Sequence, residues 1–164
     1  MKILAAAWML VAVICAPVQA QEARGKVTNL PIPRYVSIKA QEANARRGPS
    51  LNHRIDWVFH HRGTPLRVTA EHGHWRRVED VDGAGGWMHY ALLSGARYVL
   101  IRDVRADLYQ QPEEGARITA QAEAGVIARL GACTLRWCRI TAGRHTGWAR
   151  KARLWGVGQS ELRE

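Results

Sequence analysis

The chain has 164 residues, enough for one domain or two small ones, and an apolar content of 47% excludes a disordered, weakly hydrophobic protein. The formal net charge of +10 favours an anionic partner or surface. A solubilising basic surface without a dedicated ligand explains this charge equally well.

Residues 1–20 have the pattern of a secretory signal peptide. Lys2 precedes the apolar run 3–16, and the small-x-small ending predicts cleavage after Ala20. The run is shorter than the about 20 apolar residues that a membrane span needs. We therefore expect a periplasmic or secreted protein with no stable membrane span. Loss of Lys2 from the 24 basic residues, against 14 acidic ones, leaves a mature charge of +9.

Residues 21–33 show no periodicity and end in Pro-x-Pro, which predicts a flexible leader. The first compact unit, residues 34–95, consists of short runs of β character separated by turn residues at the spacing of small barrels. The alternation over residues 66–71 indicates one buried face and one wet face. The expected strands are Tyr35–Lys39, Ala43–Arg46, Ile55–Phe59, Pro65–Glu71, Trp75–Val81 and Gly86–His89.

The second unit, residues 96–157, repeats the landmarks of the first. Trp75 and Trp137 stand 62 positions apart, and the pairs Gly86-Trp87 and Gly147-Trp148 stand 61 apart. Such self-similarity indicates an internal duplication of about sixty residues. Residues 158–164 are polar, and we predict a frayed tail.

These landmarks resemble a known family. The order Asn44-x-Arg46-x-Gly48-Pro49-Ser50, followed by Gly63, Trp75 and Gly86-Trp87, is similar to the bacterial SH3-like (SH3b) domain, in particular to secreted tandem SH3-like proteins of Gram-negative bacteria. The resemblance covers roughly residues 34–157 and is weaker in the second copy, where Gln111-Pro112 stands for Gly48-Pro49. It implies an all-β fold with two tandem small SH3-like β-barrels. It also implies recognition of cell-wall fragments or protein segments, without catalysis.

Two cysteines follow the predicted signal peptide. Cys133 and Cys138 stand at hairpin spacing, and in an oxidising compartment they are best explained as a disulfide. A redox-active pair is disfavoured because the spacing is not Cys-x-x-Cys and no helix start is available. Cys15 raises the alternative of a lipid-modified cysteine, but Ile14 stands where a small residue is usual.

The repeat offset places Glu71 and Arg76 at the positions of the two cysteines. We hypothesise that this opposite-charge pair faces across the equivalent hairpin of the first unit. If the pair is exposed, its contribution is only about 0.2–1 kcal/mol.

Aromatic and basic residues supply the candidate ligand site. Trp75, Trp87, Trp137 and Trp148 occupy equivalent places and are predicted to pack the barrels. Trp57 has no aromatic counterpart in the second copy. With Tyr90 and the charges of Arg46 and Arg47, it forms our candidate groove in the first unit.

Other clusters carry weaker signals. His60 and His61 point to opposite faces of a strand, and His72 with His74 lacks the three or four convergent ligands of a zinc site, so no metal or cofactor is expected. The remaining basic runs are Arg76-Arg77 and Arg150-Lys151-x-Arg153. They suit an anionic glycan, a headgroup or an acidic protein, or they are scattered solvated charge; export argues against nucleic acid.

The resulting hypothesis is a non-enzymatic binding module of the cell envelope, with peptidoglycan or an envelope protein as partner. The alternatives are a protein-protein assembly factor of the envelope and an accessory protein of a cell-wall hydrolase. Two repeats leave no room for a catalytic domain, and no catalytic arrangement remains once the cysteines are paired.

Overall fold

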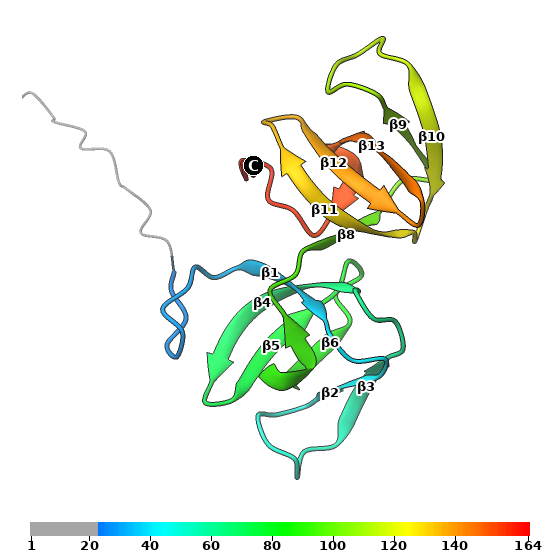
Figure 1. Cartoon of the computed structure of the whole chain (residues 1–164). Helices are drawn as coiled ribbons and strands as arrows, with labels where there is room; N and C mark the ends of the chain where they lie inside the picture. The colour runs from blue at the N-terminus through cyan, green and yellow to red at the C-terminus, as the bar shows by residue number, and fades with distance from the viewer. Residues whose placement is uncertain (1–22) are drawn as a thin grey trace, which may run out of the picture.

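The computed structural model describes residues 23–164, so the predicted signal peptide lies outside the described residues. The chain forms two antiparallel seven-stranded sheets, each curved into a small barrel (Figure 1). Barrel 1 contains β1 (Arg34–Ile38), β2 (Ala43–Arg46), β3 (Ile55–Phe59), β4 (Pro65–His72), β5 (Trp75–Glu79), β6 (Gly85–His89), the 3-10 turn η1 (Tyr90–Leu92) and β7 (Leu93–Ser94). Barrel 2 contains β8 (Tyr98–Ile101), β9 (Arg105–Tyr109), β10 (Ile118–Glu123), β11 (Ile127–Cys133), β12 (Trp137–Ala142), β13 (His145–Arg150), the 3-10 turn η2 (Lys151–Arg153) and β14 (Leu154–Trp155).

The two barrels have the same topology. The strand order is β3-β2-β6-β5-β4-β1-β7 in barrel 1 and β10-β9-β13-β12-β11-β8-β14 in barrel 2. Each element of the second sheet therefore has a counterpart at the same place in the first. This confirms the all-β fold with two tandem barrels. Among residues 23–164, no helix is long and apolar enough to cross a bilayer.

Aliphatic side chains fill both cores. Leu66 and Val68 are fully buried, as the alternation of β4 predicts, whereas Ala70 is only half-buried because the pairing of β4 with β5 shifts after Val68. Strand β5 ends two residues earlier than predicted. The Asp80 side chain accepts N–H bonds from Asp82 and Ala84 and so begins a turn.

The tryptophans contribute less to the cores than predicted. Trp137 is buried, but Trp75, Trp87 and Trp148 are only half-buried. The interiors are already filled by aliphatic and small residues such as Ala45 and Ala106. The indoles therefore lie at the margins of the barrels, where one face of each ring is available for contacts.

The hypothesis that Glu71 and Arg76 face each other across a hairpin is confirmed, and the pair is buried. They stand opposite each other across the β4–β5 hairpin, with Arg76 Nε 3.5 Å from Glu71 Oε1. Both residues are only 8% exposed. Arg76 also donates to the carbonyls of Gly73 and Trp75, so its buried guanidinium stabilises the turn between β4 and β5.

A predicted flexible leader covers this pair. Residues 23–33 form a small hairpin, in which Gly25 N donates to Leu30 O at 2.9 Å, and they dock on Glu71. The Glu71 carboxylate accepts from Val27 N (3.0 Å), Thr28 N (2.9 Å), Thr28 Oγ1 (2.7 Å) and Arg34 Nη2 (2.7 Å). Burial raises the pKa of Glu71, but the bonds from Thr28, Arg34 and Val27 outweigh it and lower the pKa to about 2. These bonds join the described part of the leader, which the sequence predicted to be flexible, to barrel 1.

The corresponding hairpin of barrel 2 carries the disulfide, which is confirmed. Cys133 and Cys138 stand opposite each other on β11 and β12 with Cα atoms 4.1 Å apart. The polar tail docks here: Cys133 N donates to Arg163 O at 2.9 Å, and Arg163 N donates to Cys133 O at 3.1 Å. Glu161 pairs with Arg97 at 2.8 Å. These bonds hold the tail, for which the sequence predicted fraying, against barrel 2.

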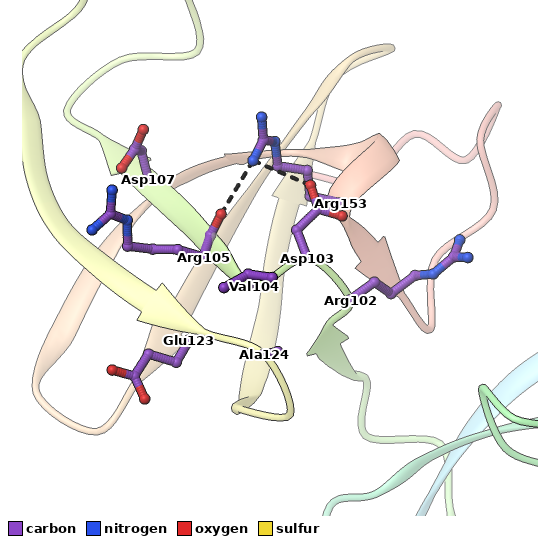
Figure 2. A pocket seen from close by; sticks show the side chains of 8 residues that line it. All are labelled: Arg102, Asp103, Val104, Arg105, Asp107, Glu123, Ala124 and Arg153. Carbon is purple, nitrogen blue, oxygen red and sulfur yellow. Dashed lines mark hydrogen bonds and ion pairs between the residues drawn. The ribbon is translucent and has the colours of Figure 1, made fainter.

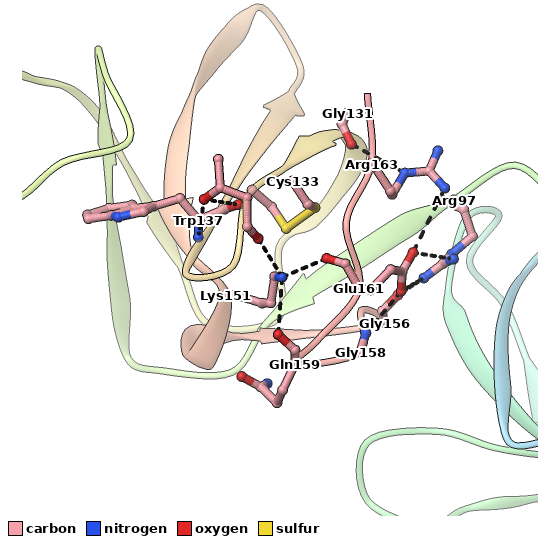
Figure 3. The surroundings of a disulfide bond; sticks show 12 residues. Arg97, Gly131, Cys133, Trp137, Lys151, Gly156, Gly158, Gln159, Glu161 and Arg163 are labelled. Atoms are coloured by element: carbon pink, nitrogen blue, oxygen red, sulfur yellow. Dashed lines mark hydrogen bonds and ion pairs between the residues drawn. A yellow bond between two sulfur atoms is a disulfide. The ribbon is translucent and has the colours of Figure 1, made fainter. Parts of the chain in front are cut away.

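Lys151 holds the tail in place. Its side chain is 1% exposed, and Nζ donates to the carbonyls of Thr134 (2.6 Å), Gln159 (3.2 Å) and Glu161 (2.7 Å) (Figure 3). Three carbonyls satisfy all three donors of the ammonium group. Burial lowers the pKa of Lys151, and the Glu161 carboxylate opposes this.

Trp155 joins the two barrels. Its ring lies edge-on to Tyr35 of β1 with centroids 5.4 Å apart, and its Nε1 donates to Pro65 O at 3.3 Å. The Arg67 guanidinium lies 5.2 Å from the Trp155 ring centroid, while the Arg97 guanidinium lies 5.7 Å from that of Tyr35. An aromatic pair enclosed by two cations fixes the barrels relative to each other.

Replacement of Trp155 by alanine is therefore expected to lower the free energy of unfolding by about 2 kcal/mol and to loosen the interface, because the substitution removes a large half-buried ring that packs on both barrels. Urea unfolding measures the first effect, and the radius of gyration in small-angle scattering measures the second. Trp57→Ala is the matched control, because Trp57 is 48% exposed and packs on Phe59 within barrel 1. An unchanged radius for Trp155→Ala would contradict the role of this residue at the interface.

Candidate binding surface

A groove with an arginine-rich lining lies on the outer face of barrel 1, and we call it the arginine groove. Its volume is about 360 Å³. Strands β2, β5 and β6 meet there beside the turn between β5 and β6. Its lining residues are Arg46, Arg47, Asp56, Thr69, Arg77, Val78, Glu79, Gly83, Gly85, Gly86 and Trp87.

The three arginines of the groove are in different states. Arg46 Nη1 donates to Leu51 O (3.1 Å) and His53 O (2.8 Å), so this side chain holds the loop between β2 and β3. Arg47 Nε lies 3.2 Å from Asp56 Oδ2. Arg77 is exposed on β5, and within residues 23–164 its guanidinium forms no ion pair or hydrogen bond. Arg77 is thus the cation most available to a ligand.

Asp56 offsets part of the positive charge of this region. Arg54 Nε lies 2.6 Å from Asp56 Oδ1, and Arg47 approaches the other oxygen. The hydrogen bond from Arg54 chiefly lowers the pKa of Asp56, so this carboxylate is ionised at neutral pH. Anion binding must therefore rely on Arg77 and on those guanidinium nitrogens of Arg47 and Arg54 that do not bind Asp56.

Glycines allow the strands to meet closely behind the groove. Gly86 has φ +149°, and a Cβ atom built there would lie 2.5 Å from Arg46 O. A Cβ atom at Gly85 would likewise clash with the carbonyl of Val78. No side chain fits at either position. On barrel 2, Tyr109 and Thr146 replace Arg46 and Gly85, whereas Arg139 keeps the place of Arg77, so the arginine lining is repeated only in part.

The four predicted site residues do not form a single groove. Arg46 and Arg47 line the arginine groove, but Trp57 and Tyr90 do not. Trp57 lies on β3 beside Phe59, with ring centroids 6.3 Å apart, and pairs across to the buried Ala45. Tyr90 lies on η1. Their ligand-binding roles stay predictions, while Arg77 and Trp87 are groove residues that the sequence pattern did not mark as ligands.

Tyr90 belongs to a second surface, which we call the histidine-aromatic seat and define as His72, His74, Trp75, His89 and Tyr90. The His74 and Tyr90 rings lie 5.5 Å apart, and those of His89 and Tyr90 lie 5.0 Å apart. Trp75 meets His89 edge-on at 5.5 Å. Among residues 23–164 the structure brings together no group of three or more potential metal ligands.

Barrel 2 has a larger but electrically balanced cavity of about 1180 Å³. Figure 2 shows Arg153 directed toward Asp103 and toward the carbonyl of Arg105, both 3.1 Å from its Nη1. Three arginines and three carboxylates offset one another, which gives little selectivity for an anion. The cavity is lined by Arg102, Asp103, Val104, Arg105, Asp107, Glu123, Ala124 and Arg153.

The basic run Arg150-Lys151-x-Arg153 is engaged within the protein. Arg150 pairs with Glu114 at 2.6 Å, and its guanidinium lies over the Trp137 ring. Lys151 is buried, and Arg153 pairs with Asp103. This run therefore does not present a free basic patch.

Comparison with known families agrees with the duplicated barrels. The family described as Bacterial SH3 domain matches the chain twice, at residues 39–95 and 102–156. The chain belongs to this family. Bacterial SH3 domains are cell-wall binding modules and are generally non-catalytic. Both docked segments, the leader and the residues after 156, lie outside the matched ranges.

Similar solved structures include two proteins of Trichomonas vaginalis. NlpC2 is 13% identical with a TM-score of 0.35, and the match covers 75% of this chain and 48% of that one. NlpC1 is 10% identical with a TM-score of 0.35, and the match covers 88% of this chain and 50% of that one. The chain thus matches about half the length of these structures. Comparison with curated proteins finds no match.

Proposed function

We propose that this protein is a non-enzymatic binding module of the periplasm or cell surface that recognises cell-wall fragments through the arginine groove of barrel 1. The observation that carries the proposal is the exposed Arg77 guanidinium beside the half-buried Trp87 in that groove. The peptide stems of peptidoglycan end in carboxylates, and its sugars pack against indole rings. A guanidinium binds a carboxylate through charge-assisted hydrogen bonds, so the two groups match this ligand chemistry.

The overall charge supports the same function. The described residues carry the full +10, because Lys2 and Glu22 outside them cancel. This excess attracts an anionic polymer at long range, whereas the groove provides contacts at short range. The two contributions respond differently to salt, since screening weakens the long-range attraction first.

Co-sedimentation of residues 21–164 with purified peptidoglycan, at low and at physiological salt, tests the proposal. Arg77→Gln is expected to reduce retention at physiological salt about tenfold, the usual effect of removing a charge-assisted hydrogen bond from the centre of a binding site. The matched control is Arg139→Gln, because Arg139 is the exposed counterpart of Arg77 on barrel 2. Trp57→Ala shows whether the site extends to β3.

Retention that only Arg77→Gln abolishes would support a specific groove. Retention only at low salt, equal in the wild type and in both arginine variants, would mean unspecific charge attraction and would contradict the proposal.

A further inference from the structure

The identical topology of the barrels allows their surfaces to be compared residue by residue. Tyr90 N donates to His74 O at 2.9 Å, and Lys151 N donates to Arg136 O at 2.9 Å. Trp75 pairs with His89, as Trp137 pairs with Arg150. Tyr90 and Lys151 therefore occupy the same place, at the start of η1 and η2, beside the same hairpin.

On barrel 2 this place is covered by the chain itself. The carbonyls of Gln159 and Glu161 accept from Lys151 Nζ, and the following residues pair with Cys133. Leu162 lies against a depression that it shares with Trp137 and Leu135. Beneath this cover Lys151 is 1% exposed, and Trp137, on which Tyr109 and the Arg150 guanidinium also pack, is 3% exposed.

On barrel 1 the same place is open. Tyr90 is 50% exposed, His72 and His74 are exposed, and Trp75 is half-buried. The leader docks on this hairpin at Glu71, which it engages through the carboxylate. No hydrogen bond joins the leader to the histidine-aromatic seat within residues 23–164. The part of the surface that residues 159–161 cover on barrel 2 thus has no equivalent cover on barrel 1 within the described chain.

The exposed polar groups of the seat determine what would fit. His89 Nδ1 accepts the N–H of Ala91, so the Nε2 of the neutral ring carries the proton and is a donor. The Tyr90 hydroxyl and the Trp75 indole add further donors next to apolar ring faces. Donors on a chain of charge +10 select an occupant rich in acceptors and negative charge.

We propose that the histidine-aromatic seat binds a short acidic peptide segment of a partner protein, in the place that residues 159–161 take on barrel 2. The segment presents its backbone carbonyls and carboxylates to Tyr90 and His89, and packs an aliphatic side chain against Trp75. This inference goes beyond the wall-binding function, because it assigns a polypeptide ligand to an adjoining surface, which meets the arginine groove where His72 lies edge-on to Trp87 with ring centroids 6.5 Å apart.

The test uses a display library of random octapeptides panned on residues 21–164, followed by fluorescence anisotropy with the best peptide. Enriched peptides are expected to be acidic, and Tyr90→Ala is expected to weaken their binding about tenfold, as for an aromatic residue at the centre of a site. Tyr90 is 50% exposed, so the variant should keep its fold, which circular dichroism verifies. Leu135→Ala is the control, because Leu135 is 68% exposed on the equivalent hairpin of barrel 2.

Equal binding to Tyr90→Ala and the wild type, or no enrichment of acidic peptides, would overturn the inference. The two proposals fail separately: Tyr90→Ala should keep its retention on peptidoglycan, and Arg77→Gln should keep its affinity for the peptide.

Discussion

Replacement of Glu71 by alanine is expected to lower the free energy of unfolding by about 3–5 kcal/mol, which is the usual cost of leaving buried charges without their partner. Arg34 and Arg76 would lose the carboxylate that both approach, and Val27 and Thr28 would lose their acceptor. Urea unfolding measures the change. Limited proteolysis should in addition show faster cleavage between residues 23 and 33, because the leader loses its anchor.

Glu71→Gln separates charge from shape. The amide keeps an acceptor for Thr28 but removes the negative charge, so an intermediate loss of stability is expected. Glu79→Gln is the matched control, because Glu79 pairs with Arg67 on the surface, where an ion pair contributes only about 0.2–1 kcal/mol. Equal losses for Glu71→Ala and the control would contradict the importance of the buried carboxylate.

The same carboxylate makes stability depend on acid. The pKa of Glu71 is about 2 in the folded protein against 4.5 as its ordinary value. Its ionised form therefore stabilises the fold fully above pH 4.5, by about 3 kcal/mol at about 1.4 kcal/mol per pKa unit, and this contribution is lost as the pH falls to about 2. Urea titrations between these pH values should show a smaller loss for Glu71→Gln than for the wild type.

Lys151→Ala is expected to cost about 2–3 kcal/mol and to release the tail. The substitution leaves the carbonyls of Thr134, Gln159 and Glu161 without their donor and opens a space in a buried position. Hydrogen exchange at the Arg163 amide, which bonds to Cys133 O, reports the release.

Lys151→Met is the companion variant, because it keeps most of the side-chain volume and removes only the ammonium group. If the three carbonyls matter, the methionine variant also releases the tail while losing less stability. A protected Arg163 amide in both variants would show that the Cys133 pairing suffices to hold the tail.

Periodicity and turn residues are enough to predict the barrels. Leu66 and Val68 alternate with polar residues, and the spacing of Trp75 and Trp137 identifies the second copy. The repeat offset alone also pairs Glu71 with Cys133. These features are local or repeated, so the sequence carries them without the fold.

Burial and docking are not predictable in this way. Thr28 of the leader binds Glu71, which lies 43 residues away in the sequence, and Glu161 of the tail binds Arg97, which lies 64 residues away. No local sequence pattern predicts contacts at such separations. The sequence likewise does not show that Trp57 and Tyr90 lie outside the groove that Arg46 and Arg47 line. Arg46 donates to carbonyls of the loop between β2 and β3. Arg77, in contrast, is marked in the sequence only as one of two adjacent arginines, Arg76 and Arg77.

The two docked segments bear on the order in which the chain folds. Bonds such as Arg97–Glu161 close long loops, and the entropy of loop closure delays contacts of this separation. Hairpins of neighbouring strands, such as β2–β3, β4–β5 and β5–β6 in barrel 1, close only short loops, so they can form before either segment arrives. During that interval the buried charges at Glu71 and Lys151 are still hydrated, and each barrel loses this water only when its own flanking segment closes over it.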